Sequence, residues 1–181
     1  ITPANLSITG TKTYDGTTNF ATGTLATAGA VNGETITLTA GNGTTTSANA
    51  ATYAGSTLTG LVMSVSGGNA LASNYALPGT GDLTITPANL SITGTKTYDG
   101  TAQFNAGALS VTGLIGSDAI GTATALSQNV IDNGSNYFTN FTLSTGSAAN
   151  YQLASAGVNN DAQITPANLS ITGTKTYDGT T

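Results

Sequence analysis

The stretch Ile1–Thr17 reads ITPANLSITGTKTYDGT, and it decides the organisation of the chain because it occurs three times. The same seventeen residues return at 85–101 and at 164–180. A period near 80 residues is too long for the coils of a solenoid, which run to roughly 20–45 residues. It suits a small domain with its own core. The sequence therefore predicts a first module at 1–84, a second at 85–163 and the opening strands of a third at 164–181.

Weaker matches between the repeats indicate that the two full modules share one fold. The pattern Asn-Tyr-x-Leu stands near the end of each module, at 74–77 and 150–153. Glu34 and Asp118 occupy equivalent places after the Tyr-Asp-Gly of their own modules. Between these matching residues the two sequences differ freely, which predicts that the modules share a fold while the segments between the matches vary.

Alternation of apolar and polar residues predicts strands within each module. Thr35–Thr39 alternates with Ile36 and Leu38 on one face, and Leu61–Val65 alternates in the same way. Asp-Gly and Asn-Gly pairs supply tight turns between such runs, beginning with Asp15-Gly16. Short strands with turns every 8–12 residues are typical of a β-sandwich. We expect an all-β fold of small, immunoglobulin-like β-sandwich modules with about seven strands each.

The junction between the modules is short. The end of the first module, Asp82–Thr86, continues through Pro87-Ala88 into the next run of alternating residues, without a Gly/Ser-rich linker. Because proline fixes its own φ, such a joint restricts hinge motion. The sequence predicts an extended, stiff rod.

Composition excludes several classes of function. The chain has a net charge of −5 with three lysines and no arginine, so it lacks the cation clusters that bind nucleic acid or anionic lipid. No apolar run reaches the roughly 20 residues of a membrane span, so we expect no membrane insertion. Without histidine or cysteine, the usual activated nucleophiles are absent. The acids of module one, Asp15, Glu34 and Asp82, stand at predicted turns or strand ends, so we expect no glycosidase pair and no enzyme.

The repeated Tyr-Asp-Gly is interpreted as a structural motif. We expect its tyrosine to pack on the sandwich, its aspartate to bond turn amides and its glycine to adopt a positive φ. Lys12 either lays its stem over apolar surface or pairs with a carboxylate. The motif residues are Tyr14, Asp15, Gly16, Tyr98, Asp99, Gly100, Tyr177, Asp178 and Gly179.

The sequence gives only weak indications of a metal site, a crosslink or a glycosylation site. We expect no cofactor, and calcium is the ion that oxygen-rich turns favour, with candidate ligands at Glu34, Asp82, Asp118, Asp132 and Asp161. Lys12, an asparagine and Glu34 supply the residue types of an isopeptide crosslink, although their spacing does not indicate one. Asn-x-Ser/Thr sequons open a route to glycosylation, and they stand at Asn5, Asn42, Asn89, Asn133, Asn140 and Asn168.

The combination of ITPANLSITGTKTYDGT, a later Gly-acid turn, Asn-Tyr-x-Leu and a returning Ile-Thr-Pro-Ala resembles the YDG-type repeats. It is also similar to the mostly-β, glycine-rich (MBG) repeats. The resemblance implies a large bacterial exoprotein of the filamentous-haemagglutinin, two-partner-secretion kind, with an extracellular or cell-surface location and an outer-membrane export partner. It implies no catalytic residues. In the second module Gly116-Ser117-Asp118 departs from the Gly33-Glu34 spacing.

These observations favour a structural stalk or fibre of a surface adhesin or biofilm-matrix protein, whose partners are neighbouring repeats or other copies in a fibre. The alternative is a carbohydrate-binding, lectin-like β-sandwich, which needs a concave site with exposed aromatic side chains. Ice binding needs short regular coils that an 80-residue period does not supply. The opening of the third module has too little to bury alone. We expect the next stretch of a longer fibre, or a neighbouring chain, to complete it.

Overall fold

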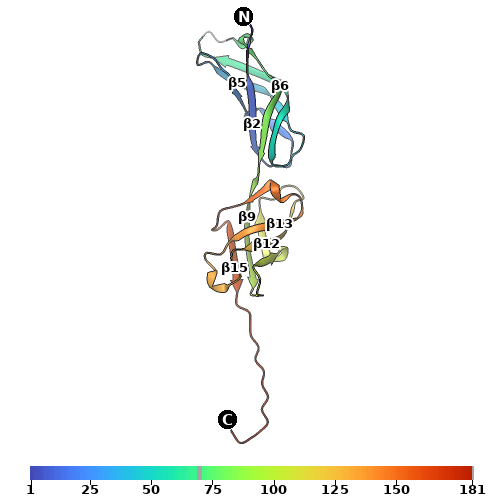
Figure 1. The fold of residues 1–181 in the computed structure, drawn as a ribbon, viewed down its shortest axis with the longest axis vertical. Coiled ribbons are helices and arrows are strands. Elements are labelled where there is room, and N and C mark those ends of the chain that lie inside the picture. The colour runs from blue at the N-terminus through green and yellow to red at the C-terminus, as the bar shows by residue number, and fades with distance from the viewer. Residues whose placement is uncertain (69–70, 181) are drawn as a thin grey trace.

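The computed structural model describes residues 1–68 and 71–180, and it confirms the all-β prediction. Every strand pairing among these residues joins strands of the same module. Module 1 comprises residues 1–86 and module 2 residues 88–165, and the two lie one after the other along the longest axis of the molecule (Figure 1). The boundary predicted after residue 84 falls at Pro87, because the last strand of module 1 continues to Thr86.

Among the described residues the predicted seven strands per module match module 2, whereas module 1 has eight because the stretch equivalent to β9 is divided into the two strands β1 and β2. The strands of module 1 are β1 (Ala4–Asn5), β2 (Ser7–Thr13), β3 (Asn19–Ala21), β4 (Leu25–Ala28), β5 (Thr35–Thr44), β6 (Ala51–Ser66), β7 (Tyr75–Ala76) and β8 (Thr80–Thr86). Those of module 2 are β9 (Ala88–Thr97), β10 (Gln103–Asn105), β11 (Leu109–Thr112), β12 (Ala119–Ala125), β13 (Phe138–Thr145), β14 (Tyr151–Leu153) and β15 (Asn160–Thr165).

The helices of the described residues are five single 3₁₀ turns, η1 (Thr22–Thr24), η2 (Ala72–Asn74), η3 (Ala106–Ala108), η4 (Val130–Asp132) and η5 (Ala148–Asn150). None of them has the length or the apolar character needed to cross a membrane.

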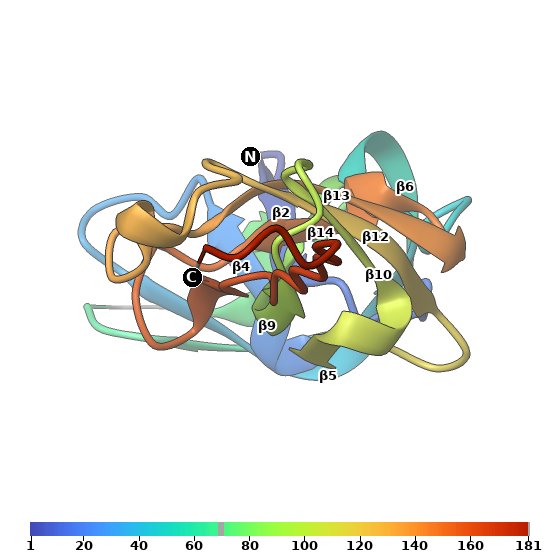
Figure 2. The same cartoon turned by 90° about the horizontal axis from the view of Figure 1, so that it is seen from below.

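In each module the strand that carries the Ser-Ile-Thr-Gly part of the motif pairs in parallel with the last strand. In module 1, β2 lies between β8, which is parallel to it, and β4, which is antiparallel. In module 2, β9 has the same two neighbours in β15 and β11. The registers agree, with Thr9 opposite Asp82 and Thr93 opposite Asp161. Seen along the long axis, β2 and β9 lie near the middle of the molecule (Figure 2). Because parallel strands run in one direction, the chain enters each module at one end and leaves at the other.

Each module closes a core around a phenylalanine from a three-residue strand. Phe20 of β3 and Phe104 of β10 are fully buried. In module 2 the core joins residues of the β10–β12–β13 sheet to residues of β9 and β15, so these two sheets pack face to face. In module 1 one continuous path, β3–β5–β6–β8–β2–β4, surrounds a smaller core. Its buried members are Ile8, Phe20, Leu58, Leu83 and Ile85.

The glycine of the shared motif makes room for this packing. A Cβ on Gly10 would lie 2.7 Å from a methyl of Leu83 and 3.1 Å from the ring of Phe20. A Cβ on Gly94, its equivalent, would lie 3.1 Å from the ring of Phe138. A Cβ at Gly94 would also lie 2.9 Å from the carbonyl oxygen of Ala108. Real Cβ atoms essentially never come within 3.0 Å of another heavy atom, so a side chain at either position would force its neighbours to shift.

Residues 166–180 form an extended segment that leaves the far end of module 2 (Figure 1). Its apolar side chains are exposed: Leu169 at 90% and Ile171 at 92%. The equivalent Leu6 and Ile8 in module 1 are 5% and 2% exposed. Identical sequence is therefore buried or exposed according to whether the rest of a module surrounds it.

This contrast supplies a matched pair of variants. Ile92→Ala removes a side chain that is fully buried in module 2, and we expect it to lower the free energy of unfolding of that module by about 2–4 kcal/mol. Ile171→Ala changes the same motif position in the exposed segment, and we expect a change within about 0.5 kcal/mol. Chemical denaturation measures both. Equal losses for the two variants would contradict the core described above.

Candidate functional site

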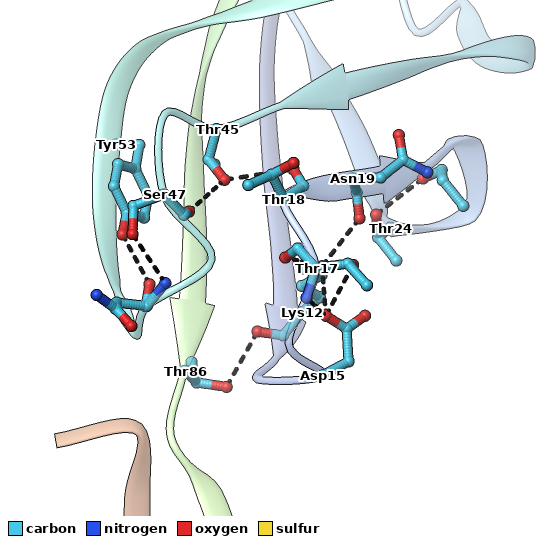
Figure 3. A network of polar contacts seen from close by, with 12 residues as sticks. Lys12, Asp15, Thr17, Thr18, Asn19, Thr24, Thr45, Ser47, Tyr53 and Thr86 are labelled. Carbon is cyan, nitrogen blue, oxygen red and sulfur yellow. Dashed lines mark hydrogen bonds and ion pairs between the residues drawn. The ribbon is translucent and has the colours of Figure 1, made fainter. Parts of the chain in front are cut away.

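The lysine of the shared motif folds back over its own Tyr-Asp-Gly turn. Lys12 Nζ donates to Asp15 Oδ1 at 2.7 Å, to the carbonyl and hydroxyl oxygens of Thr17 at 2.8 Å each, and to the carbonyl of Asn19 at 2.9 Å (Figure 3). The same ammonium lies 5.1 Å from the centre of the Phe20 ring. We call this arrangement the lysine clasp. It ties the turn after β2 to strand β3 and closes the edge of the core.

The aspartate organises the turn as predicted. Asp15 Oδ1 accepts the backbone N–H of Thr17 and its hydroxyl, both at 2.9 Å. Gly16 has a φ of 77°, a left-handed conformation that favours glycine. The two alternatives for Lys12 are both realised, since its side chain is 8% exposed, covers an aromatic face and pairs with a carboxylate.

The lysine clasp recurs in module 2 with nearly identical geometry. Lys96 Nζ reaches Asp99 at 2.7 Å, the Thr101 carbonyl at 2.7 Å and the Gln103 carbonyl at 2.8 Å, and it lies 5.1 Å from the centre of the Phe104 ring. In the extended segment Lys175 still pairs with Asp178 at 2.9 Å. That lysine is 51% exposed, because no phenylalanine or β3-like strand lies beneath it.

The clasp lowers the pKa values of its aspartates. The hydrogen bond from Lys96, followed by those from Thr101, lowers the pKa of Asp99 to about 2. For Asp15, burial acts to raise the pKa, but the hydrogen bonds from Lys12 and Thr17 together outweigh it and lower the pKa. The clasp therefore favours the ionised form of both carboxylates.

Tyr14 is held at the end of its module by backbone pairing. Its N–H donates to the carbonyl of Thr86 at 2.8 Å, and the next residue of that strand is Pro87. The Thr86 hydroxyl donates to the carbonyl of Lys12 at 3.2 Å, which fixes the same pair of strands once more (Figure 3). The tyrosine thus projects where the chain passes from module 1 to module 2.

The ring of Tyr14 packs against both hydrophobic cores. It meets the ring of Tyr151 edge-to-face, with 5.4 Å between ring centres and 80° between ring planes. Its hydroxyl lies 3.5 Å from Asp118 Oδ2, at the limit of hydrogen-bond distance. Ile115 of module 2 approaches the neighbouring Gly16, with a methyl 3.3 Å from the place of a Cβ. We call these contacts the tyrosine joint.

A second polar contact reinforces the tyrosine joint. Asn150 accepts the backbone N–H of Ala50 through Oδ1 at 2.8 Å, and its amide nitrogen donates to Asn49 Oδ1 at 3.0 Å. Asn150 is 2% exposed, whereas its equivalent Asn74 in module 1 is exposed. The loop before β6 of module 1 therefore covers the asparagine of the Asn-Tyr-x-Leu pattern in module 2.

The surface that receives Tyr14 is built from the repeated anchors. Tyr151 donates its hydroxyl to Asp118 Oδ2 at 2.6 Å and accepts the N–H of Ile115 at 3.0 Å. Burial, followed by the hydrogen bond to Asp118, raises the pKa of Tyr151 to about 12. We call Ile115, Asp118, Asn150 and Tyr151 the acceptor end of module 2.

Module 1 carries the same acceptor end. The Tyr75 hydroxyl donates to Glu34 Oε2 at 2.6 Å and accepts the N–H of Val31 at 3.0 Å. The hydrogen bond to Glu34 raises the pKa of Tyr75. The acid and the Asn-Tyr-x-Leu pattern, which the sequence repeats, thus meet in space in both modules, with glutamate as the acid in module 1 and aspartate in module 2.

The calcium candidates are dispersed and each has a partner in its own module. Glu34 and Asp118 accept from tyrosines, Asp82 accepts the N–H of Gly55 at 3.0 Å, and the carboxylate oxygens of Asp161 accept from Gln163 at 3.0 and 2.9 Å. Asp132 accepts the hydroxyl of Ser127 at 2.5 Å. Within residues 1–68 and 71–180, no three acidic side chains gather in a group that could hold a metal ion.

The residue types of an isopeptide crosslink are not brought together around Lys12, whose nitrogen bonds within the clasp while Glu34 bonds Tyr75. The tyrosine part of the motif prediction needs correction. Tyr14 packs on its own module and on the next, whereas Tyr98 is 42% exposed and Tyr177 is 93% exposed. The reason is physical: a tyrosine at this position is covered only where another module follows.

One surface hollow of the described chain bears no aromatic or charged side chain. It lies over β9, β11 and β14 and is lined by polar and small residues that include Asn89, Thr112, Gln152 and Asn159. The aromatic platform that the lectin alternative requires is not part of this hollow.

Acid titration tests the lysine clasp. The pKa of Asp99 in the folded chain, about 2, lies below its ordinary value of 3.8, so the clasp stabilises module 2 fully above that ordinary value and loses its effect as the pH falls toward 2. We expect the melting temperature of module 2, followed by its NMR amide signals, to fall between pH 4 and pH 2. Asp99→Asn should melt lower at neutral pH and show a shallower fall. Parallel pH profiles for the two proteins would contradict this role of Asp99.

Comparison with known proteins agrees with the module division. The YDG domain family model matches residues 1–82 and again residues 81–158. Neither the search of curated proteins nor the search of solved structures finds a match. The two family matches cover most of the chain and each overlaps one structural module, although the second match begins within β8 and ends before β15. The chain therefore belongs to the YDG domain family, and it contains two YDG domains in tandem.

Proposed function

We propose that this chain is a structural stalk or fibre segment of a secreted bacterial surface adhesin or biofilm-matrix protein. The observation that carries the proposal is the tyrosine joint, in which Tyr14 packs on both cores and faces Tyr151 and Asp118. Direct contact beside a proline linker opposes bending between modules. The parallel first and last strands place entry and exit at opposite ends, so successive modules add length.

The resemblance to YDG-type and MBG repeats of filamentous-haemagglutinin-like exoproteins supports the location. In this proposal the modules are immunoglobulin-like sandwiches in an extended rod, exported across the outer membrane by a dedicated partner. Labelling of intact, unpermeabilised cells of the producing organism by an antibody against the chain tests that location. Labelling only after permeabilisation would exclude a surface stalk.

The proposal requires the two modules to keep a fixed orientation relative to each other. In weakly aligned solution, NMR residual dipolar couplings should yield the same alignment tensor for both modules of the unchanged chain. Tyr14→Ala removes the aromatic pair, which is worth about 0.5–1.5 kcal/mol beyond its buried area, and we expect the two tensors to diverge.

Tyr98→Ala is the matched control, because it changes the same motif position in module 2, where the tyrosine is 42% exposed and does not touch the other module. We expect it to leave both tensors as they are. Two different tensors in the unchanged chain, or an unaltered pair in Tyr14→Ala, would remove the support that the tyrosine joint gives to a stiff stalk.

A further inference from the structure

The strand that carries the repeated motif is bonded directly to the strand through which the chain leaves the same module. In module 2 these are the motif strand β9 and the exit strand β15, which pair in parallel along the whole length of β15. The N–H of Ile92 donates to the carbonyl of Asn159 at 3.0 Å at one end of the pairing, and the N–H of Tyr98 donates to the carbonyl of Thr165 at 2.8 Å at the other. We call this set of backbone hydrogen bonds the exit ladder.

Module 1 has the same exit ladder between its motif strand β2 and its exit strand β8. The pairing begins with Thr9 opposite Asp82 and ends with Thr13 opposite Thr86. The N–H of Tyr14 donates to the carbonyl of Thr86 at 2.8 Å, which matches the last hydrogen bond of the ladder in module 2. The segment just before each ladder is also paired in parallel, through β1 with β7 and through the start of β9 with β14. Both modules therefore hold the motif segment in the same way.

Both exit strands are also held on their second edge. In module 1, β8 pairs with β6. In module 2 the Asn133 side chain takes the place of such a strand, since its Oδ1 accepts the N–H of Ile164 at 2.9 Å and its Nδ2 donates to the carbonyl of Ile164 at 2.8 Å. The N–H of Ala162 donates to the carbonyl of Asn136 at 3.1 Å. Because each exit strand is fixed to the body of its module, a pull between the two ends of a module bears on the exit ladder.

The direction of the strands decides how such a pull acts on the ladder. β9 runs along the longest axis of the molecule (Figure 1), and β15 is parallel to it. The chain therefore enters at one end of the ladder and leaves at the other, so tension along the chain draws the two strands in opposite directions along their common axis. A displacement in that direction strains the evenly spaced hydrogen bonds of a parallel ladder together. A pull across the strands breaks them one after another.

We propose that each YDG domain is a load-bearing unit, in which the exit ladder resists tension applied along the chain. As a biological role this inference rests on the proposed function, because a stalk transmits tension between its ends. As a property of the fold it requires neither a surface location nor a stiff joint between modules. The ladder of module 2 lies between residues inside the chain, so its loading is the same whatever precedes or follows the two modules.

Single-molecule pulling from engineered cysteines tests the proposal, since the chain has no cysteine of its own. Handles at Thr2→Cys and Ala167→Cys, two exposed residues outside the strands, stretch both modules along their exit ladders. Handles at Thr97→Cys and Ala167→Cys draw β15 sideways from the end of β9 and peel the same ladder of module 2. Each unfolding event should release about 25 nm of chain in either geometry, at up to ~3.6 Å per residue.

The two directions of pull should give different forces. At one loading rate, we expect both unfolding events along the ladders to need a several-fold higher force than the peeling event. Chemical denaturation of the two cysteine variants is the control, and it should give equal free energies of unfolding. The difference in force then reports the direction of load, because forced unfolding depends on the unfolding rate and not on the equilibrium stability.

Tyr98→Pro and Tyr98→Ala form a matched pair that separates the ladder from the tyrosine ring. Both variants remove the ring, but only proline removes the N–H that donates to Thr165. With handles at Thr2→Cys and Ala167→Cys, we expect Tyr98→Pro to lower the force of one of the two unfolding events. Tyr98→Ala should leave both forces as they are.

Equal forces in the two directions of pull, or unchanged forces in Tyr98→Pro, would overturn the load-bearing role of the exit ladder. Matching alignment tensors in a chain with such forces would leave the stiff stalk standing and remove only the load-bearing role. Diverging tensors in a chain that resists tension along its ladders would remove the stiffness and keep the load-bearing role.

Discussion

The parallel pairing of the motif strand with the last strand of each module is the constraint on which the rest of the structure depends. β2 with β8, and β9 with β15, share one register. A chain that enters and leaves in the same direction must exit at the far end, so the next module begins where the previous one stops. An antiparallel last strand would return the chain to its starting end and fold the two modules back on each other.

That pairing also explains why a tyrosine stands in the repeated motif. Tyr14 is the residue that follows β2, and its N–H bonds the carbonyl of Thr86 just before the proline of the linker. The lysine clasp secures the turn behind it, because Lys12 ties Asp15 and Thr17 to the edge of the core. The motif thus has two parts with different structural roles. Lysine, aspartate and glycine shape the end of one module, and tyrosine contacts the beginning of the next.

Much of the fold could be predicted because it depends on patterns among residues that are close together in the sequence. The literal repeat gives the modules, and alternation around Ile36 and Leu38 gives β5. The short strands that carry Phe20 and Phe104 were not predicted. Three residues between turns are too few to show an alternation of apolar and polar side chains. Strand β12 escaped as well, because Ala119–Ala125 is built of alanine, glycine and threonine with a single isoleucine and shows little alternation of apolar and polar side chains.

The candidate site was harder to predict because its parts lie about a hundred residues apart. Tyr14 and Asp118 meet only after both modules have folded, and no local pattern marks that contact. A signal was present nevertheless. The acid after each Tyr-Asp-Gly and the Asn-Tyr-x-Leu pattern are kept in both modules while their surroundings differ, and these are the residues of the acceptor ends. A tyrosine hydroxyl needs an acceptor when it is buried, and this rule points to Glu34 and Asp118 as partners of Tyr75 and Tyr151.

The central claim is that the tyrosine joint holds two YDG domains as one body, and a distance distribution between them tests it most directly. Ala26→Cys and Ser110→Cys place spin labels at equivalent exposed positions on β4 and β11, in a chain that has no other cysteine. Pulsed electron–electron double resonance in frozen dilute solution should give one narrow distribution of label-to-label distances, no wider than the labels' own rotamers allow. A broad or multiple distribution in the otherwise unchanged chain would show that the modules turn freely about Pro87, and would contradict the account.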